Sequence, residues 1–497
     1  MSDDLDPQTL GLSLISHTNV GKTTLARTLL RADIGEVRDE AHVTREAEPY
    51  TMIESPAGDR LQLWDTPGFG DSVRLARRLA QAGNPLGWFM TEVWDRFRDR
   101  AFWSGQRAVR NVLEQADVVL YLVNAAETPE DVGYLDAELE VLDLAAKPVV
   151  VLLNQLGRPQ TPAAETQELE RWRRRTAEAR CVRQVLALDA FARCWVQEDA
   201  LLGAVAGVLP ADRHAAFDRL RAAWRQRSSA TWHASMAVLA QRLVRAALDR
   251  EAIEDGGLGG RLRDVGALLG LRREGASTPR ELAMQRLAAR LAEDIRQCTD
   301  RLIDLHRLEG HATDVVLTRL AEHYAVQEPV NEGRAAVWGG AVAGALAGLK
   351  ADVLSGGMTL GGGLLAGGLL GALGAAGLAR GFNLLRGVET PTLGWAPEVL
   401  DEQVRSALLG YLAVAHYGRG RGPWAEEEGP AFWQDSVQAV VAERHEALQA
   451  MWVELQSLRQ AGAGPQDAGE LVARLQAWLV EVSRTLLWRL YPGAVLD

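Results

Sequence analysis

The pattern of apolar and polar positions divides the chain near residue 210. Before that point, short apolar runs suited to buried strands alternate with longer segments of helical spacing. This alternation is typical of an α/β domain on a mostly parallel sheet, so we expect one over residues 1–210, with its ligand at the carboxyl ends of the strands. The clearest strands are expected at residues 12–15, 61–64, 118–123, 149–153 and 183–187.

After residue 210 the strand pattern stops. Apolar residues now recur at spacings that suit amphipathic helices, and a glycine cluster at 256–260 and the segment from Gly275 to Pro279 mark expected breaks between them. The sequence therefore predicts an all-α second half, with a helical domain over 211–330 and a C-terminal helical region over 391–497. Within the latter, helices are expected at 399–416, 432–461 and 470–490.

Between these helical regions, residues 331–390 form a glycine-rich apolar stretch. Uncharged runs of 15 and 27 residues, 335–349 and 353–379, lie on either side of Lys350 and Asp352. Glycine at every fourth position lets helices pack closely in membranes. A helix over the longer run would span about 40 Å, more than the hydrocarbon core of roughly 30 Å. One interpretation is a membrane hairpin that turns near Lys350, and the other is a hairpin packed inside the helical domain.

Composition narrows the class of protein. At 497 residues the chain is long enough for two or three domains. A formal net charge of −12 argues against a concentrated basic surface, so no nucleic-acid partner is expected. Cys181, Cys194 and Cys298 lack metal-ligand spacing and fit a reducing cytoplasm. Because the start shows no basic region followed by an apolar one, we expect a cytoplasmic protein without a secretory signal.

The candidate chemistry begins at residues 16–24, which read Ser-His-Thr-Asn-Val-Gly-Lys-Thr-Thr and join the first predicted strand to a helix. Such a junction directs backbone N–H groups and the helix dipole at one point, where a polyphosphate can bind. The pattern G-x-x-x-x-G-K-[S/T] puts Lys22 at the β- and γ-phosphates and the Thr23 hydroxyl on magnesium. Ser16 stands where this pattern has glycine. The alternative interpretation is a chance G-K-T in an ordinary turn.

A second segment suits a nucleotide switch. Residues 61–68 read as an alternating strand that ends in a D-x-x-G motif, which in nucleotide switches places the Asp65 carboxylate beside magnesium and the Gly68 N–H on the γ-phosphate. Thr44 lies in a polar segment between the two motifs, where a switch threonine completes the magnesium shell. The predicted metal ligands are therefore Thr23, Thr44 and Asp65.

These motifs resemble the GTPase superfamily of translation-factor-related switches over residues 10–209. Asn19 in G-x-x-N-x-G-K-[S/T] and the W-D-T-P-G motif are similar to the branch that contains TrmE, Era and the septins. The resemblance implies GTP and GDP as ligands, Mg²⁺ as cofactor, and catalysis that involves Lys22, Thr44 and Asn19. In the TrmE-like branch the matching asparagine helps to coordinate K⁺, often upon dimerisation of the GTPase domains. K⁺ and a homodimer are thus further expectations, unless Asn19 only shapes the loop.

The whole arrangement also resembles a bacterial family whose C-terminal domain has no known function. The base-recognition motif departs from the superfamily pattern, because residues 154–157 read Asn-Gln-Leu-Gly instead of Asn-Lys-x-Asp. Gly157 replaces the carboxylate that accepts two hydrogen bonds from guanine, each worth roughly 1.5–3 kcal/mol. GTP is the ligand that the resemblance implies, and ATP or loose selectivity is the alternative. The predicted nucleotide-binding residues are Ser16, His17, Thr18, Asn19, Val20, Gly21, Lys22, Thr23, Thr24, Asp65, Gly68, Asn154 and Gln155.

Phe69 follows the D-x-x-G motif, where many switches have a glutamine that orients the attacking water. A phenyl ring can neither donate nor accept that hydrogen bond, so hydrolysis is expected to depend on another group or to be slow. The aromatic-rich segment 69–103 is predicted either as an effector surface or as an inserted helix packed on the C-terminal half. The arginines of 171–175 are expected on a solvated helix face, with anionic-lipid contact as the alternative.

Three functions from different classes fit these observations. The first is a membrane-associated GTPase switch that hydrolyses GTP and signals to the helical half through residues 69–103. The second is a dynamin-like membrane-remodelling GTPase, with residues 335–379 inserted in lipid. The third is a nucleotide-binding module with little turnover. The first two place the protein in the cytoplasm, at the inner face of the cell membrane.

Overall fold

The computed structural model forms two compact units. The first comprises Met1–Ala230, Ala415–Gly422 and Ala494–Asp497, and the second comprises Thr231–Val414 and Pro423–Gly493. The domain boundary predicted near residue 210 falls at the start of a helix whose first part belongs to the first unit. The structure describes residues 7–18, 20–31, 48–81, 83–91, 100–155, 162–188, 194–253, 279–308, 382–385, 392–417, 431–492 and 494–496.

The first unit is built on a six-stranded sheet with the strand order β2-β3-β1-β4-β5-β6. Strand β2 runs antiparallel to β3, and every other pairing in this sheet is parallel. The mostly parallel sheet predicted for this half of the chain is therefore confirmed. The strands are β1 Thr9–Ser16, β2 Glu48–Glu54, β3 Arg60–Asp65, β4 Val118–Asn124, β5 Val149–Asn154 and β6 Val182–Ala187.

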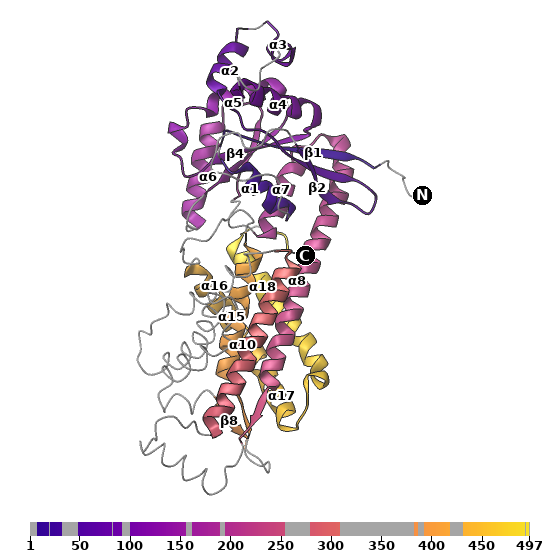
Figure 1. Cartoon of the computed structure of the whole chain (residues 1–497), viewed down its shortest axis with the longest axis vertical. Helices are drawn as coiled ribbons and strands as arrows, with labels where there is room; N and C mark the ends of the chain where they lie inside the picture. Colours follow the sequence, from indigo (N-terminus) through magenta and orange to yellow (C-terminus); the bar gives the residue numbers. More distant parts are fainter. Residues whose placement is uncertain are drawn as a thin grey trace. The chain divides into compact units, whose positions relative to one another are not determined.

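Strands β4 and β5 are almost continuously apolar because helices cover both faces of the sheet. All residues of β5 are buried, and in β4 only Asn124 is not fully so. Figure 1 shows α4 and α5 on one side of the sheet and α1 and α7 on the other. The helices of this unit are α1 Lys22–Leu30, α2 Ser72–Leu79, α3 Pro85–Thr91, α4 Arg100–Gln115, α5 Leu135–Ala145, α6 Pro162–Thr176 and α7 Trp195–Ala206, with a 3-10 helix η1 at Pro129–Asp131.

The aromatic segment after β3 packs inside the first unit. Phe69, Phe89 and Phe102 are at most 1% exposed and share one apolar core with side chains of β4, β5 and α5. The prediction of an effector surface, or of packing on the C-terminal half, was wrong for these residues because their rings fill the core beside the sheet. Trp94 and Phe97 lie outside the described residues.

The arginines of α6 form ion pairs at the surface. Arg171 Nη2 lies 2.8 Å from Glu130 Oε2, and Arg175 binds both carboxylate oxygens of Asp136 at 2.5 and 2.8 Å. These acids belong to the neighbouring η1 helix and to α5. These arginines therefore lie on a solvated helix face, as the mixed charges of the segment predicted.

The second unit is mostly helical, as predicted. Helix α8, Ala211–Leu248, begins in the first unit and continues into the second. The single helix predicted over 432–461 is two helices, because Arg444, at φ −121° and ψ 22°, leaves the helical conformation between them. The other helices are α10 Pro279–Leu305, α15 Pro397–Ala415, α16 Ala431–Glu443, α17 His445–Gln460 and α18 Gly469–Leu490, with a 3-10 helix η3 at Pro465–Ala468.

A small antiparallel sheet in the second unit, with the order β7-β9-β8, was missed by the all-α prediction. Its strands have only three or four residues, too few for an alternating pattern to be recognised. Arg459 of α17 is buried beside it, and its Nη1 donates to the carbonyl oxygens of Ala247 and Trp395 at 3.3 and 3.1 Å. The strands are β7 Arg250–Ala252, β8 Phe382–Leu385 and β9 Thr392–Trp395.

The glycine-rich stretch 335–379, interpreted as a membrane hairpin, lies outside the described residues. Within the part of the chain that the structure describes, every helix lacks the combination of length and apolar character that a bilayer crossing requires. The membrane interpretation of the glycine-rich stretch therefore stays a prediction.

Candidate functional site

The candidate site lies at the carboxyl end of β1, where a loop enters α1. Ser16 is the last residue of β1, and Lys22 is the first of α1. Gly21 between them has φ 91° and ψ 29°, a left-handed conformation that favours glycine, and a Cβ there would meet Asn154 Nδ2 at 2.9 Å. The positive end of the α1 dipole and its first N–H groups therefore face the loop. Asn19 lies outside the described residues.

Lys22 is buried in this loop and links its two ends. The Nζ atom donates a hydrogen bond to Ser16 Oγ at 2.9 Å. A Cβ added to Gly68 would lie 3.0 Å from the same Nζ, so glycine allows the D-x-x-G motif to approach the lysine. Burial lowers the pKa of Lys22, and the charges of Asp65 and Glu138 oppose this shift. The serine that replaces the expected glycine is thus the hydrogen-bond acceptor of the lysine.

Thr23 and Asp65 meet directly, although they lie 42 positions apart in the chain. Thr23 Oγ1 donates to Asp65 Oδ2 at 2.7 Å, and Asp65 is 3% exposed. The D-x-x-G segment is held against the loop because Phe69 N donates to Ser16 O at 2.9 Å. A hydroxyl and a carboxylate are oxygen ligands of the kind that Mg²⁺ prefers, so this pair fits the predicted metal. Thr44, the third predicted ligand, lies outside the described residues.

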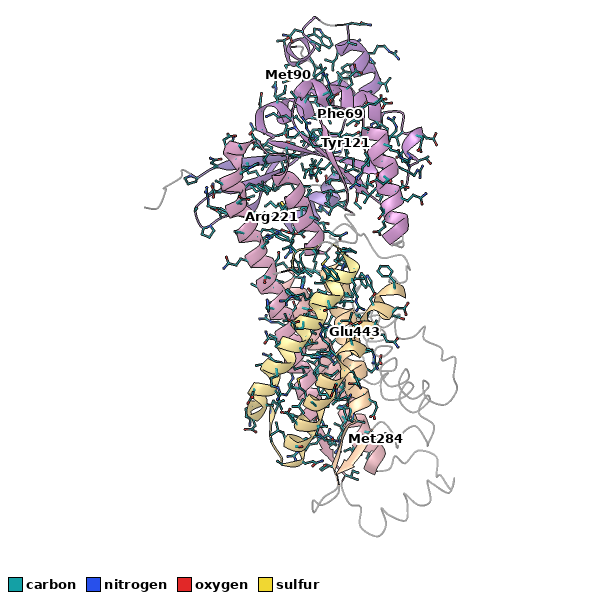
Figure 2. All side chains as sticks on the ribbon, turned by 180° about the vertical axis from the view of Figure 1, so that it is seen from behind. Phe69, Met90, Tyr121, Arg221, Met284 and Glu443 are labelled. Carbon is teal, nitrogen blue, oxygen red and sulfur yellow. The ribbon has the colours of Figure 1, made fainter. Side chains whose placement is uncertain are left out.

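Phe69 contributes its main chain to the site and its side chain to the core. The ring is 0% exposed and packs in the cluster that contains Leu75 and Phe89. Figure 2 labels it close to Tyr121 in the interior of the first unit. The backbone of Phe69 pairs with that of His17 as an isolated parallel bridge. The position after D-x-x-G therefore presents no side chain to the phosphate loop.

Asn154, predicted as a base-contacting residue, supports the loop in this structure. Its side chain is fully buried, and Nδ2 donates to Val20 O at 2.7 Å. Gln155 follows with φ 59°, a left-handed conformation at the end of β5. Gly157 lies outside the described residues, so the selectivity for guanine stays a prediction.

The two remaining predicted residues belong to the loop and to α1. Thr18 passes close to the D-x-x-G motif, since a Cβ on Gly68 would lie 3.2 Å from Thr18 Cα. Thr24 is buried in the first turn of α1, and its carbonyl oxygen accepts from Thr28 Oγ1 at 2.9 Å. Thr24 therefore contributes to the packing of α1 beneath the loop.

Glu138, a buried carboxylate on α5, was not predicted as a residue of the site. Oε1 of Glu138 lies 2.7 Å from His17 Nδ1, and Oε2 accepts from Tyr121 OH at 2.7 Å. Burial raises the pKa of Glu138, and the hydrogen bonds from His17 and Tyr121 oppose that shift. A signal was present in the sequence, because Glu138 is spaced three and four residues from Leu135 and Leu142 and so interrupts an apolar helix face.

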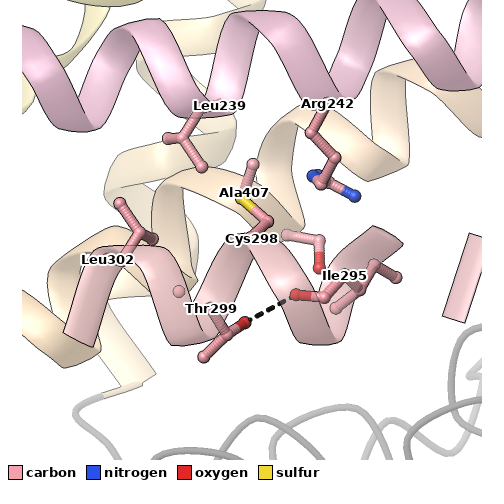
Figure 3. Close-up of a pocket in the computed structure, with 9 residues that line it drawn as sticks. Leu239, Arg242, Ile295, Cys298, Thr299, Leu302 and Ala407 are labelled. Carbon is pink, nitrogen blue, oxygen red and sulfur yellow. Dashed lines mark hydrogen bonds between the residues drawn. The ribbon is translucent and has the colours of Figure 1, made fainter. Parts of the chain in front are cut away.

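A cavity in the second unit, among α8, α10 and α15, is too small for a nucleotide. Figure 3 shows Arg242, Cys298 and Thr299 among the residues that line it, with Thr299 Oγ1 donating to Ile295 O at 2.9 Å. The volume is about 30 Å³, enough for only a few water molecules. The loop at the end of β1 is therefore the better candidate for the functional site.

The meeting of a buried lysine, a hydroxyl and a D-x-x-G carboxylate where β1 enters α1 is the arrangement of a P-loop GTPase domain, and the first unit is one. Family models agree, because residues 12–155 match the model described as 50S ribosome-binding GTPase. Residues 174–477 match the model described as domain of unknown function (DUF3482). That match covers more than half of the chain, so the chain belongs to this family.

Three solved structures with similarity to this chain contain guanine nucleotides. Era in complex with MgGDPNP and nucleotides 1506–1542 of 16S ribosomal RNA is 17% identical with a TM-score of 0.31, over 41% of this chain and 58% of that chain. Era from Aquifex aeolicus bound to GDP and AlF4⁻ is 18% identical with a TM-score of 0.30, over 41% and 57%. Toc33 from Arabidopsis thaliana in complex with GDP and Mg²⁺ is 12% identical with a TM-score of 0.25, over 38% and 74%.

At these identities the likeness concerns the fold alone, and it spans less than two thirds of either Era chain. Comparison with curated proteins finds no match. The expectation that excluded nucleic acid as a partner was wrong, because Era, a protein with similarity to this chain, is solved with a segment of 16S ribosomal RNA. A net charge averages over the whole chain, whereas a nucleic acid interacts with the local surface that it contacts.

Proposed function

We propose that this chain binds GTP, hydrolyses it to GDP and phosphate, and acts as a nucleotide switch. The observation that carries the proposal is the meeting of Thr23 with Asp65 at the start of α1, beside the buried Lys22. An ammonium group, a hydroxyl and a carboxylate at a helix N-terminus suit a triphosphate together with its metal. The match of residues 12–155 to a GTPase model supports GTP as the nucleotide.

The residues of this site would act by positioning and by electrostatic stabilisation. Lys22 Nζ, which is bound to Ser16 Oγ in this structure, would donate to the β- and γ-phosphate oxygens and stabilise the negative charge that develops on them. Thr23 and Asp65 would hold Mg²⁺, which neutralises phosphate charge when bound. The Gly68 N–H would donate to the γ-phosphate, since the segment lies against the loop, where a Cβ on Gly68 would be 3.0 Å from Lys22 Nζ and 3.2 Å from Thr18 Cα.

Turnover is expected to be slow for the isolated chain. The side chain of Phe69 is buried in the core, so the position after D-x-x-G cannot orient the attacking water. We propose that K⁺, coordinated with the help of Asn19, supplies part of the missing charge stabilisation in a dimer of GTPase domains. This proposal depends on the asparagine in the loop sequence, since Asn19 lies outside the described residues.

The switch role is supported by an ion pair between the β2–β3 hairpin and α8. Strand β3 ends at Asp65, and Asp59 directly precedes its first residue. Asp59 is fully buried and accepts two hydrogen bonds from Arg219 of α8, from Nε at 2.7 Å and from Nη2 at 2.8 Å. The pKa of Asp59 is held well below its ordinary value, chiefly by the hydrogen bond from Arg219, so this pair is charged at neutral pH.

Helix α8 is anchored to the first unit at further points and then leaves it. Arg221 and Arg225 both pair with Asp199 of α7, at 3.0 and 2.9 Å. Figure 2 labels Arg221 on this helix. The same helix continues past Ala230 into the second unit and ends at Leu248. A movement of the hairpin with the nucleotide state would therefore be passed to the helical unit through one continuous helix.

Phosphate release and nucleotide binding test the proposal. Lys22→Ala should weaken GTP binding about 100-fold or more, because two lost hydrogen bonds to charged groups cost about 3 kcal/mol. Lys147→Ala, between α5 and β5, is the matched control and should bind GTP like the wild type. Unchanged affinity of Lys22→Ala would contradict the assignment of the loop.

The same assay separates the alternatives. Parallel measurements with GTP and ATP test base selectivity, and measurements in K⁺ and in Na⁺ test the role of Asn19. Equal rates in the two salts would remove the potassium proposal. GTP that is bound but not hydrolysed, in K⁺ and at high protein concentration, would favour the nucleotide-binding module with little turnover.

Membrane association of the switch is a proposal that depends on residues 335–379. It predicts that the full chain sediments with phospholipid vesicles and that a chain without 335–379 stays in solution. Retained GTP binding would show that the shortened chain is folded. Nucleotide-dependent tubulation of the vesicles would favour the dynamin-like alternative, whereas a full chain that stays in solution would contradict membrane association.

A further inference from the structure

The carboxylate of Glu138 binds His17 of the phosphate loop, and it has no role in the hydrolysis proposed above. Both carboxylate oxygens are engaged, Oε1 with His17 Nδ1 and Oε2 with the Tyr121 hydroxyl, each at 2.7 Å. Glu138 is 0% exposed. The charge of Glu138 also opposes the lowering of the Lys22 pKa that burial causes.

His17, the second residue of the loop, is held on two sides. Besides the contact with Glu138, its ring stacks on Tyr134 with a centroid distance of 4.1 Å and an angle of 11° between the ring planes. Tyr134 is itself fixed, because its hydroxyl donates to Glu127 Oε2 at 3.3 Å. The backbone of His17 pairs with Phe69, just after the D-x-x-G motif. The imidazole therefore connects the loop to the start of α5.

A buried carboxylate at this place is not explained by core stability. Leu139 and Leu142 lie on the same helix and are buried in the apolar core, so a leucine at position 138 would continue their packing. Replacing a buried ionic group by an apolar residue of similar volume is often neutral or stabilising. The carboxylate instead supplies directed hydrogen bonds, which orient the imidazole in a way that apolar packing cannot.

We propose that Glu138 is a positioning residue for nucleotide binding. Through its contact with His17 it holds the phosphate loop in the conformation that binds the diphosphate part of the nucleotide. This inference rests on the proposed function, because it presumes that the loop binds GDP and GTP. Because GDP and GTP share the diphosphate that this loop contacts, Glu138 affects the dissociation rates of both nucleotides more than the rate of hydrolysis. Tyr121 orients the carboxylate from the opposite side.

The test measures the dissociation rate of GDP labelled with a fluorescent methylanthraniloyl group from the full chain in Mg²⁺. Glu138→Leu and His17→Ala should each speed dissociation about tenfold, the effect expected from one lost hydrogen bond to a charged group. The double variant should also dissociate about tenfold faster, not about 100-fold, because both changes remove the same support. Glu140→Gln, which changes an exposed carboxylate on the same helix, is the matched control and should stay within about threefold of the wild type.

A purely structural role predicts other results. In that case Glu138→Leu lowers the melting temperature and leaves the dissociation rate unchanged, which would overturn the inference. Rates that multiply in the double variant would also overturn it, since Glu138 would then not act through His17. With GTP, we expect a higher KM and a kcat within about threefold of the wild type.

Unfolding of a variant must be distinguished from loss of the His17 contact. If Glu138→Leu loses its helical circular dichroism, Glu138→Gln replaces it in the single and double variants, because the amide keeps the shape of the side chain but not its charge. If the wild type fails to bind labelled GDP, the proposed function itself has failed. If the wild type binds and the variants release GDP at the wild-type rate, only the role of Glu138 is refuted.

Discussion

Removing the Arg219 side chain tests most directly whether the GTPase domain communicates with α8. The change Arg219→Met keeps a long apolar stem but deletes both hydrogen bonds to Asp59, which measure 2.7 and 2.8 Å. Hydrogen bonds to a charged group contribute roughly 1.5–3 kcal/mol each. Because the Arg219 side chain is 29% exposed, solvent offsets part of the loss, and we expect about 2 kcal/mol less stability of the hairpin against local opening. This corresponds to an opening equilibrium about 30-fold larger.

Amide hydrogen exchange followed by mass spectrometry reads this local stability in the full chain. The β2–β3 turn is closed by Gly58 N donating to Ser55 O and by Ser55 N donating to Asp59 O, each at 2.9 Å. Peptides that cover residues 48–65 should exchange about 30-fold faster in Arg219→Met. Arg225→Met is the matched control, because it removes an ion pair from the same helix while Arg221 still holds Asp199. In that control the hairpin should exchange at the wild-type rate.

The nucleotide dependence then tests transmission itself. In the wild type, replacing GDP by a non-hydrolysable GTP analogue should change the exchange of both the hairpin and residues 211–230. In Arg219→Met the change should remain in the hairpin and disappear from α8. Unchanged protection of residues 48–65 in the variant, or a uniform loss of protection over both units, would refute this reasoning.

Two further predictions follow from buried groups of the first unit. Phe69→Gln should not accelerate phosphate release, because this side chain lies in the core, and a large rise in kcat would contradict that placement. The buried amide should also lower the free energy of unfolding by about 3 kcal/mol or more, as measured by thermal unfolding. Because the pKa of Asp59 is lowered in the folded chain, its stabilising effect is complete above the unfolded value of about 3.9 and is lost as the pH falls further. The difference in melting temperature between the wild type and Asp59→Asn should therefore shrink below about pH 4, and a constant difference would argue against a charged pair.

The parts of the site that could be predicted from the sequence are those that a short motif specifies. Residues 16–24 and 65–68 each form a short motif whose residue types and spacing are typical of phosphate and metal binding. Their roles could therefore be inferred without knowing which distant segments pack against them. Strands β1, β3, β4, β5 and β6 and the helical half followed from apolar periodicity for the same local reason, whereas the edge strand β2 was not predicted. Three-residue and four-residue strands carry too little pattern, which is why the sheet of β7, β8 and β9 was missed.

The amino-acid order by itself determined that a strand, a phosphate loop and a helix come together, and that the second half is helical. Only the tertiary structure decided that Glu138 binds His17 across 121 positions, that Asp59 meets Arg219 across 160, and that the Phe69 ring lies in the core. Periodicity shows which face of an element is buried, because that depends on local spacing. The partner of a buried charge depends on how distant elements pack, and local spacing does not contain that information.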